Sequence, residues 1–213
     1  MIDSTLGRCK TEFLSGDAKF HFNGTDDVNF DVQEFWAWSA SDLVENTARG
    51  VLAEFLVAKA LDISMTKPRR GWGSYDLKTD DELKIEVKSA AYVQSWNQSK
   101  LSSIQFDIKK RQGWDPDTDI EAPVAQREAD VYVFALLAHK DKPSINPLDL
   151  SQWEFWALAT VELDRRERSQ HSIALNSLIG LAGPSVGFND LPDAFLRAVV
   201  QQKELELVPV AEK

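Results

Sequence analysis

The clearest pattern in the chain is a run of apolar positions at helical spacing between Ser41 and Leu61. Apolar side chains that recur every three or four residues mark the buried face of an amphipathic helix. Ser39 or Ser41 can cap the start of this helix, and acidic residues follow where the helix dipole favours negative charge. We therefore predict a helix over residues 41–61.

Two short segments of alternating apolar and polar residues come next, Tyr75–Lys78 and Leu83–Lys88. Alternation with period two is typical of a strand that buries one of its faces. The polar residues Thr79–Glu82 between the two segments have the composition of a turn. The pattern predicts a β-hairpin.

Further apolar runs predict three more strands and two C-terminal helices. The strands are Ile104–Ile108, Val131–Leu137 and Trp153–Leu163, and the helices are Ile173–Ala182 and Pro192–Gln202. The nearly continuous apolar run of the second of these strands is typical of a strand buried on both faces. The order of elements predicts an α/β protein with a mixed central β-sheet flanked by helices.

We expect a single domain over residues 1–213, with a core in 41–140 and a C-terminal strand and helices in 141–213. Residues 1–40 form an N-terminal elaboration in which turn signals alternate with short aromatic segments. These segments are expected to be strands or turns. They are Lys19–Phe22 and Phe35–Trp38.

The composition is that of an ordinary globular protein, with 43% hydrophobic and 27% charged residues. No stretch approaches the ~18 apolar residues of a membrane-spanning helix. The one cysteine, Cys9, has no second cysteine with which to form a disulfide within the chain. These features exclude disordered and disulfide-scaffold classes. We expect a cytoplasmic protein that does not associate with membranes.

The chain carries 24 basic and 34 acidic residues, a formal net charge of −10 at pH 7. Proteins with an extended nucleic-acid footprint usually show an excess of Lys and Arg. Basic residues nevertheless cluster in Lys67–Arg70 and Lys109–Arg111, and a local cluster can override the net charge within ~8–10 Å. The acidic balance leads us to expect that a homodimer or a partner subunit supplies part of any binding surface.

The polar face of the predicted hairpin is the first candidate site. If the turn is centred on Asp81, paired residues have numbers that sum to 162, so Asp76 lies opposite Glu86 with Cβ atoms ~4.5–5.5 Å apart. Lys88 shares this face, while the apolar residues take the other face and can pack on a helix. Two close carboxylates favour a cation between them, and Mg²⁺ is suited to such oxygen ligands. A solvated charged face would show the same pattern.

Glu54 lies on the apolar stripe of the predicted helix. Burying a carboxylate is costly unless it is paired or bound to a metal ion. Glu54 is therefore a candidate third acid of the site. The alternative is a residue at the edge of the stripe that reaches solvent or pairs with Lys59 or Arg49.

The sequence Gly50–Glu54 on a helix, then Asp76, then Glu86–Lys88, resembles the PD-(D/E)xK nuclease superfamily over residues 41–140. The resemblance implies a restriction-endonuclease-like fold. It also implies that Asp76, Glu86 and the main-chain carbonyl of Val87 bind a catalytic Mg²⁺, for which Mn²⁺ substitutes, and that Glu54 completes the metal site. Lys88 would position or activate the attacking water. The family's proline before the first acid is replaced here by Tyr75.

The activity implied by this resemblance is metal-dependent endonucleolytic hydrolysis of DNA phosphodiester bonds, in prokaryotic restriction, defence or repair. Candidate DNA contacts are basic or polar groups near the predicted site: Lys67, Arg69, Arg70 and Gln94. For the basic loop a solvated surface is an equal alternative, and for Gln94 the alternative is a simple surface or cap contact. The same alternatives apply to Lys109–Arg111.

Two other hypotheses stay open on the sequence. The chain is either a non-catalytic domain of the same fold that binds nucleic acid or a protein partner, or an acidic interaction protein whose charged hairpin is only solvated. The discriminating feature is whether Glu54, Asp76, Glu86 and Lys88 converge on one point in the folded chain.

Overall fold

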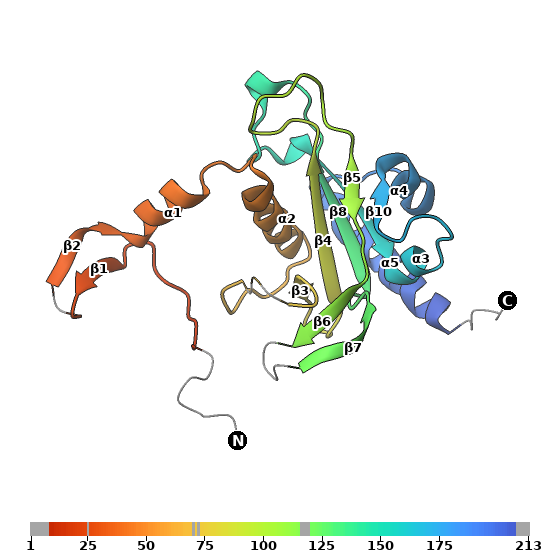
Figure 1. Cartoon of the computed structure of the whole chain (residues 1–213), viewed down its shortest axis with the longest axis horizontal. Coiled ribbons are helices and arrows are strands. Elements are labelled where there is room, and N and C mark those ends of the chain that lie inside the picture. Colours follow the sequence, from red (N-terminus) through yellow and green to blue (C-terminus); the bar gives the residue numbers. More distant parts are fainter. Residues whose placement is uncertain (1–8, 25, 70, 72, 116–119, 208–213) are drawn as a thin grey trace. The chain divides into compact units, whose positions relative to one another are not determined.

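The structure is a computed structural model and describes residues 9–24, 26–69, 71, 73–115 and 120–207 (Figure 1). By its internal contacts the chain divides into two compact units. The first unit comprises the residues up to Ser41 together with Met65–Gly71. The second comprises Asp42–Ser64 and the chain from residue 72 onward, and it carries the predicted hairpin.

In the first unit, β1 (Lys19–Phe22) and β2 (Asp26–Asp31) pair antiparallel and lead into α1 (Val32–Ala40). The strand prediction for β1 is confirmed, but the strand or turn predicted at Phe35–Trp38 is wrong because this segment is helical. A capping box at Asp31 explains the difference: its carboxylate accepts from the N–H of Glu34, whose carboxylate accepts from the N–H of Asp31. These bonds satisfy orphan donors at the helix start.

The second unit is built on a four-stranded mixed sheet with the order β3-β4-β8-β9. Its strands are β3 (Leu77–Lys78), β4 (Lys84–Ala91), β8 (Val131–Leu137) and β9 (Trp153–Ala159). The central pair β4 and β8 is parallel, and the two outer pairs are antiparallel. The predicted mixed sheet is confirmed.

Each face of this sheet is covered by a separate hydrophobic cluster. Helices α2 (Asn46–Ala60) and α5 (Leu191–Glu206) pack on one face. The other face carries the antiparallel pair of β5 (Gln105–Asp107) and β10 (Ser172–Ala174), with α3 (Thr160–Asp164) and α4 (Leu175–Ala182). Every residue of β8 is buried, as expected for a strand covered on both sides. Short 3-10 helices occur at Lys142–Ser144, Leu150–Gln152 and Phe188–Asp190.

The ends of several elements differ from the sequence predictions. Helix α2 begins at Asn46 because the carboxylate of Glu45 caps it by accepting from the next backbone N–H groups. The strand predicted over Trp153–Leu163 stops at Ala159, which pairs with the first residue of β8, Val131. Residues beyond Ala159 therefore have no strand partner and turn into α3. The helix predicted from Ile173 starts two residues later, since Ile173 itself lies in β10 and pairs with β5.

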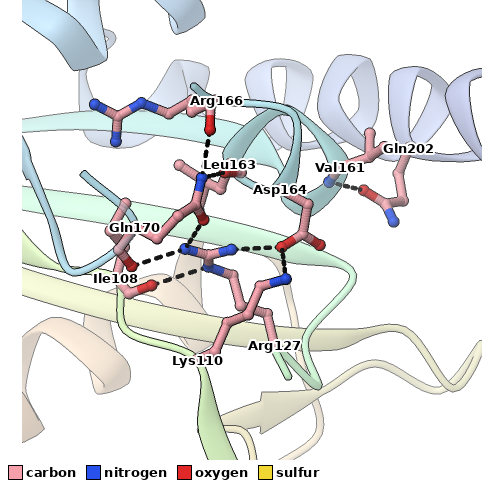
Figure 2. A network of polar contacts seen from close by, with 9 residues as sticks. All are labelled: Ile108, Lys110, Arg127, Val161, Leu163, Asp164, Arg166, Gln170 and Gln202. Carbon is pink, nitrogen blue, oxygen red and sulfur yellow. Dashed lines mark hydrogen bonds and ion pairs between the residues drawn. The ribbon is translucent and has the colours of Figure 1, made fainter. Parts of the chain in front are cut away.

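The strands β6 (Arg111–Asp115) and β7 (Ile120–Gln126) form an antiparallel pair that the sequence pattern did not predict. The base of this pair is held by Arg127, whose buried side chain donates to the carbonyl of Ile108 at 2.9 Å and to Gln170. Figure 2 shows Arg127 and Lys110 both reaching the carboxylate of Asp164 on α3. The start of β6 and the end of β7, which together form the base of the pair, are thus tied to one helix.

Among the described residues, no helix combines the length and the apolar character needed to cross a membrane.

Candidate active site

The β3–β4 hairpin has the register that the sequence predicted. Leu77 pairs with Ile85 and Lys78 pairs with Lys84, so the residue numbers sum to 162. In the turn, the N–H of Glu82 donates to the carbonyl of Thr79 at 3.0 Å, and Glu82 has a φ of 67°. A turn followed by one left-handed residue is a common way to close a hairpin with a short loop. The predicted register is confirmed.

Asp76 lies just before β3 and is held against β4. Its backbone N–H donates to the carbonyl of Ile85 at 3.0 Å. Its Oδ2 accepts from the backbone N–H of Val87 at 2.8 Å. The carboxylate of Asp76 is therefore fixed beside the stretch of β4 that carries Glu86 and Lys88.

Glu86 and Lys88 lie on one face of β4 and form an ion pair, with 2.5 Å between the ammonium and the carboxylate. Both side chains are largely withdrawn from solvent, at 16% and 21% exposure for Glu86 and Lys88. Burial and the charge of Asp76 raise the pKa of Glu86, while the Lys88 ammonium acts in the opposite direction. The site thus holds two mutually repelling carboxylates with one amine beside them.

The opposite face of the hairpin is apolar, as predicted. Ile85 and Val87 are buried in the cluster that includes Ala53 and Val57 of α2. On the polar side, Glu86 is the register neighbour of Tyr132 on β8. Burial and the nearby charge of Glu86 raise the pKa of the Tyr132 phenol, so this hydroxyl stays protonated at neutral pH. Tyr132 gives the carboxylate pair a neutral, buried neighbour.

Glu54 is buried in α2, with 8% of its surface exposed, as its position on the apolar stripe indicated. In the part of the chain that the structure describes, no three His, Cys, Asp or Glu side chains are grouped so as to hold a metal ion. The structure brings Asp76, Glu86 and Lys88 together on the hairpin, and the role of Glu54 as a third acid stays a prediction. Oxygen ligands for a metal are available from Asp76, Glu86 and the carbonyl of Val87.

Gln94 is buried and makes internal hydrogen bonds. Its amide nitrogen donates to the carbonyl of Ala91 at 2.9 Å, and its carbonyl oxygen accepts from Arg49 at 3.3 Å. Arg49, which is only 4% exposed, also donates to Ser89 one residue after Lys88. This link between α2 and β4 was not predicted, because the sequence pattern indicated Arg49 only as a partner for Glu54.

The predicted basic contacts fall in different places. Lys67 and Arg69 are exposed residues of the first unit, and Arg70 lies outside the described residues. In the second cluster, Lys110 pairs with Asp164 at 3.2 Å. Arg111 pairs with Asp107 at 2.7 Å. The two neighbouring cations thus have different partners.

A mixed α/β sheet with two close carboxylates and an adjacent lysine is an arrangement suited to phosphodiester chemistry. The sequence model of the family described as bacteriophage T4 endonuclease IV matches residues 13–177, which include all of these groups. The prediction of a nuclease is confirmed by this match.

The match covers most of the chain, and the chain belongs to the bacteriophage T4 endonuclease IV family. No curated protein sequence matches the chain significantly.

Proposed function

We propose that the chain is a metal-dependent endonuclease that hydrolyses phosphodiester bonds in DNA, with a site of the PD-(D/E)xK kind. The observation that carries this proposal is the cluster of Asp76, Glu86 and Lys88 on one hairpin in a chain of an endonuclease family. Roles in prokaryotic restriction, defence or repair are part of the same proposal.

The oxygen atoms at this site fit a magnesium ion. Mg²⁺ is commonly bound by one or two carboxylates while it keeps several waters and shares phosphate oxygens with a substrate. Asp76, Glu86 and the Val87 carbonyl would hold it. Burial and the charge of Asp76 raise the pKa of Glu86, and a bound cation would relieve the repulsion between the two carboxylates. When bound, the ion supplies a more acidic water and stabilises negative charge on the phosphate. Mn²⁺ is expected to substitute.

The residues of the chain supply positioning and charge. The bond from the Val87 N–H holds the Asp76 carboxylate in place before any ligand arrives. The Lys88 ammonium, already beside Glu86, would orient the attacking water and stabilise negative charge that develops on the phosphate. Preorganised charges of this kind contribute about 10²–10³-fold each to the rate.

Two expectations for other residues belong to the proposal. Glu54 would assist the metal site from α2, and Lys67, Arg69 and Arg70 would contact DNA. Gln94, the fourth predicted contact, is buried and hydrogen-bonded within the chain, so its proposed role is to hold the segment after β4 in place. The net charge of −10 leaves limited basic surface for a polyanion. We therefore also propose that a homodimer or a partner subunit completes the binding surface, which sedimentation of the chain with and without DNA would test.

The experiment compares the cleavage of supercoiled plasmid by wild type, Asp76→Asn and Lys88→Ala in Mg²⁺ or Mn²⁺. We expect both variants to lose about 10²-fold or more in rate, while Asp76→Asn binds DNA at least as tightly because a charge that repels phosphate is gone. Lys78→Ala is the matched control, because Lys78 lies on the same hairpin but pairs with Glu82 in the turn. Its rate should stay within about twofold of wild type.

Unchanged cleavage by Asp76→Asn would overturn the proposal. Binding of DNA by the wild type without cleavage would instead favour a non-catalytic domain of the same fold. A Glu54→Gln variant tests the assisting role: loss of cleavage with an unchanged urea midpoint supports a role at the metal, whereas loss of stability alone indicates a packing role.

A further inference from the structure

Arg111 is a cation that has no role in the proposed site, although it lies near the carboxylate pair of that site. It is the first residue of β6 and forms an ion pair with Asp107 at the end of β5, with 2.7 Å between Nη2 and Oδ2. The Arg111 side chain is 69% exposed. A guanidinium has five N–H donors, and this ion pair occupies one of them.

Asp107 holds the guanidinium at a defined place. Its Oδ1 accepts from the backbone N–H of Lys109 at 3.0 Å, which orders the turn between β5 and β6. Its other oxygen, Oδ2, is the one that binds Arg111. Because one carboxylate both shapes the turn and binds the side chain, Arg111 loses less conformational freedom when it binds a ligand.

The location of this pair is beside the candidate active site. Strand β5 contacts β4 (Figure 1). Two residues after Arg111, a Cβ placed on Gly113 would lie 3.4 Å from the Cβ of Ser74, and Ser74 is two residues before Asp76. Strand β6 therefore runs along the segment that carries the first acid of the site.

The charges agree with this location. Arg111 acts to lower the pKa of Glu86, against the larger effects of burial and of Asp76. Lys88 in turn acts to lower the pKa of Asp107. The carboxylates and cations of the hairpin and of the β5–β6 turn thus lie within electrostatic reach of one another.

Lys110 differs from Arg111 in direction. Lys110, the residue before β6, binds Asp164, where it meets the buried Arg127 (Figure 2). The partner of Arg111 is instead Asp107, at the end of β5.

We propose that Arg111 binds a backbone phosphate of the DNA at the cleavage site, and that Asp107 is its positioning residue. This inference rests on the proposed function. A guanidinium binds phosphate through parallel N–H groups, and an exposed guanidinium beside two carboxylates offsets their repulsion of the substrate. In a chain of net charge −10, such a local cation brings the phosphate to the acids.

The test measures the affinity of a fluorescent DNA oligonucleotide for wild type, Arg111→Gln and Lys110→Gln in EDTA, over a series of salt concentrations. Arg111→Gln should weaken binding by about tenfold and reduce the slope of log K against log salt by about 0.9 for duplex or 0.7 for single-stranded DNA. Lys110→Gln removes the same charge one residue away and should change affinity by less than about twofold.

Arg111→Lys is the second variant, since it keeps a cation and the pairing with Asp107. It should recover part of the affinity but not all, because an ammonium lacks the planar fork of donors. In the cleavage assay with Mg²⁺, Arg111→Gln should raise KM by about tenfold with little change in kcat.

Equal losses in Arg111→Gln and Lys110→Gln would overturn the inference, because they would indicate long-range attraction alone. Wild-type affinity in Arg111→Gln would overturn it too. If the wild-type chain cleaves DNA, either result leaves the proposed function intact. If wild type binds DNA but does not cleave it, the proposed hydrolysis fails while the binding comparison still decides the role of Arg111. A wild-type chain that neither binds nor cleaves DNA overturns both.

Discussion

Glu86 combines the properties that the chemistry of this site requires. It is withdrawn from solvent, lies within reach of the charge of Asp76, and is balanced by Lys88 on the same strand. Its burial is tolerable because the ammonium is so near. A residue in this environment is held ready for a cation, and its ionisation should be measurable in the stability of the protein.

The raised pKa of Glu86 predicts a pH dependence of stability. The folded state holds this proton more tightly than the unfolded state, so the stability contributed by Glu86 is fully present below its ordinary pKa of 4.5 and is lost as the pH rises through the folded value. In EDTA, the free energy of unfolding of wild type minus that of Glu86→Gln should therefore fall between pH 4 and pH 7. Urea unfolding at each pH measures it.

Asp76→Asn supplies the control for this effect. With the like charge removed, the pKa of Glu86 should move down and the loss of stability should become smaller. The raised pKa of Glu86 would be contradicted if the difference in free energy of unfolding between wild type and Glu86→Gln stayed constant or grew as the pH rises.

At the scale of elements, the site depends on how the β6–β7 pair is attached. Arg127 and Lys110 flank this pair and both bind Asp164, so the start of β6, where Arg111 lies, is anchored to α3. The side chain of Arg127 is fully buried, whereas that of Lys110 is 44% exposed. The two ion pairs share one carboxylate but differ in burial.

This difference predicts unequal effects on stability. Arg127→Met removes the buried partner of an ion pair whose carboxylate is half-exposed. It also leaves the carbonyls of Ile108 and Gln170 without their donor, which should cost about 3 kcal/mol. Lys110→Met breaks an exposed pair and should cost about 1 kcal/mol or less. Urea unfolding of the two variants makes the comparison. Similar losses in both would show that Arg127 does not anchor the hairpin.

The secondary-structure elements also show which features follow from the local sequence pattern and which depend on tertiary pairing. The β3–β4 hairpin follows from alternation and a polar turn, so its register was predictable from about a dozen residues. The end of β9 and the start of α4 were not predictable from local sequence. Val131 determines where β9 loses its partner, and Phe106 pairs with Ile173, which makes Ile173 a strand residue. Both partners lie far away in the sequence.

At the scale of the whole molecule, a net charge of −10 means that any cation will stabilise the folded chain to some degree by screening. A specific site must therefore show more than this general effect. Mg²⁺ at about 100 times its dissociation constant should stabilise the wild type by about 2.7 kcal/mol.

Thermal unfolding in MgCl₂ and in NaCl of equal ionic strength measures this stabilisation. Glu86→Gln is the matched comparison, since it retains almost all of the acidic surface while losing one proposed ligand. We expect a rise in Tm with Mg²⁺ for the wild type that is largely absent in the variant. An equal rise in both proteins would mean that the ion acts on the acidic surface rather than at Asp76 and Glu86.

The amino-acid sequence by itself determined the hairpin, its register, and hence the neighbourhood of Asp76, Glu86 and Lys88, because backbone pairing across a short turn depends only on residues close in the chain. Only the tertiary structure decided that Arg111 pairs with Asp107 at the turn between β5 and β6, and that Arg49 joins α2 to β4. These relations depend on how separate elements pack against the sheet, and no local periodicity encodes that packing.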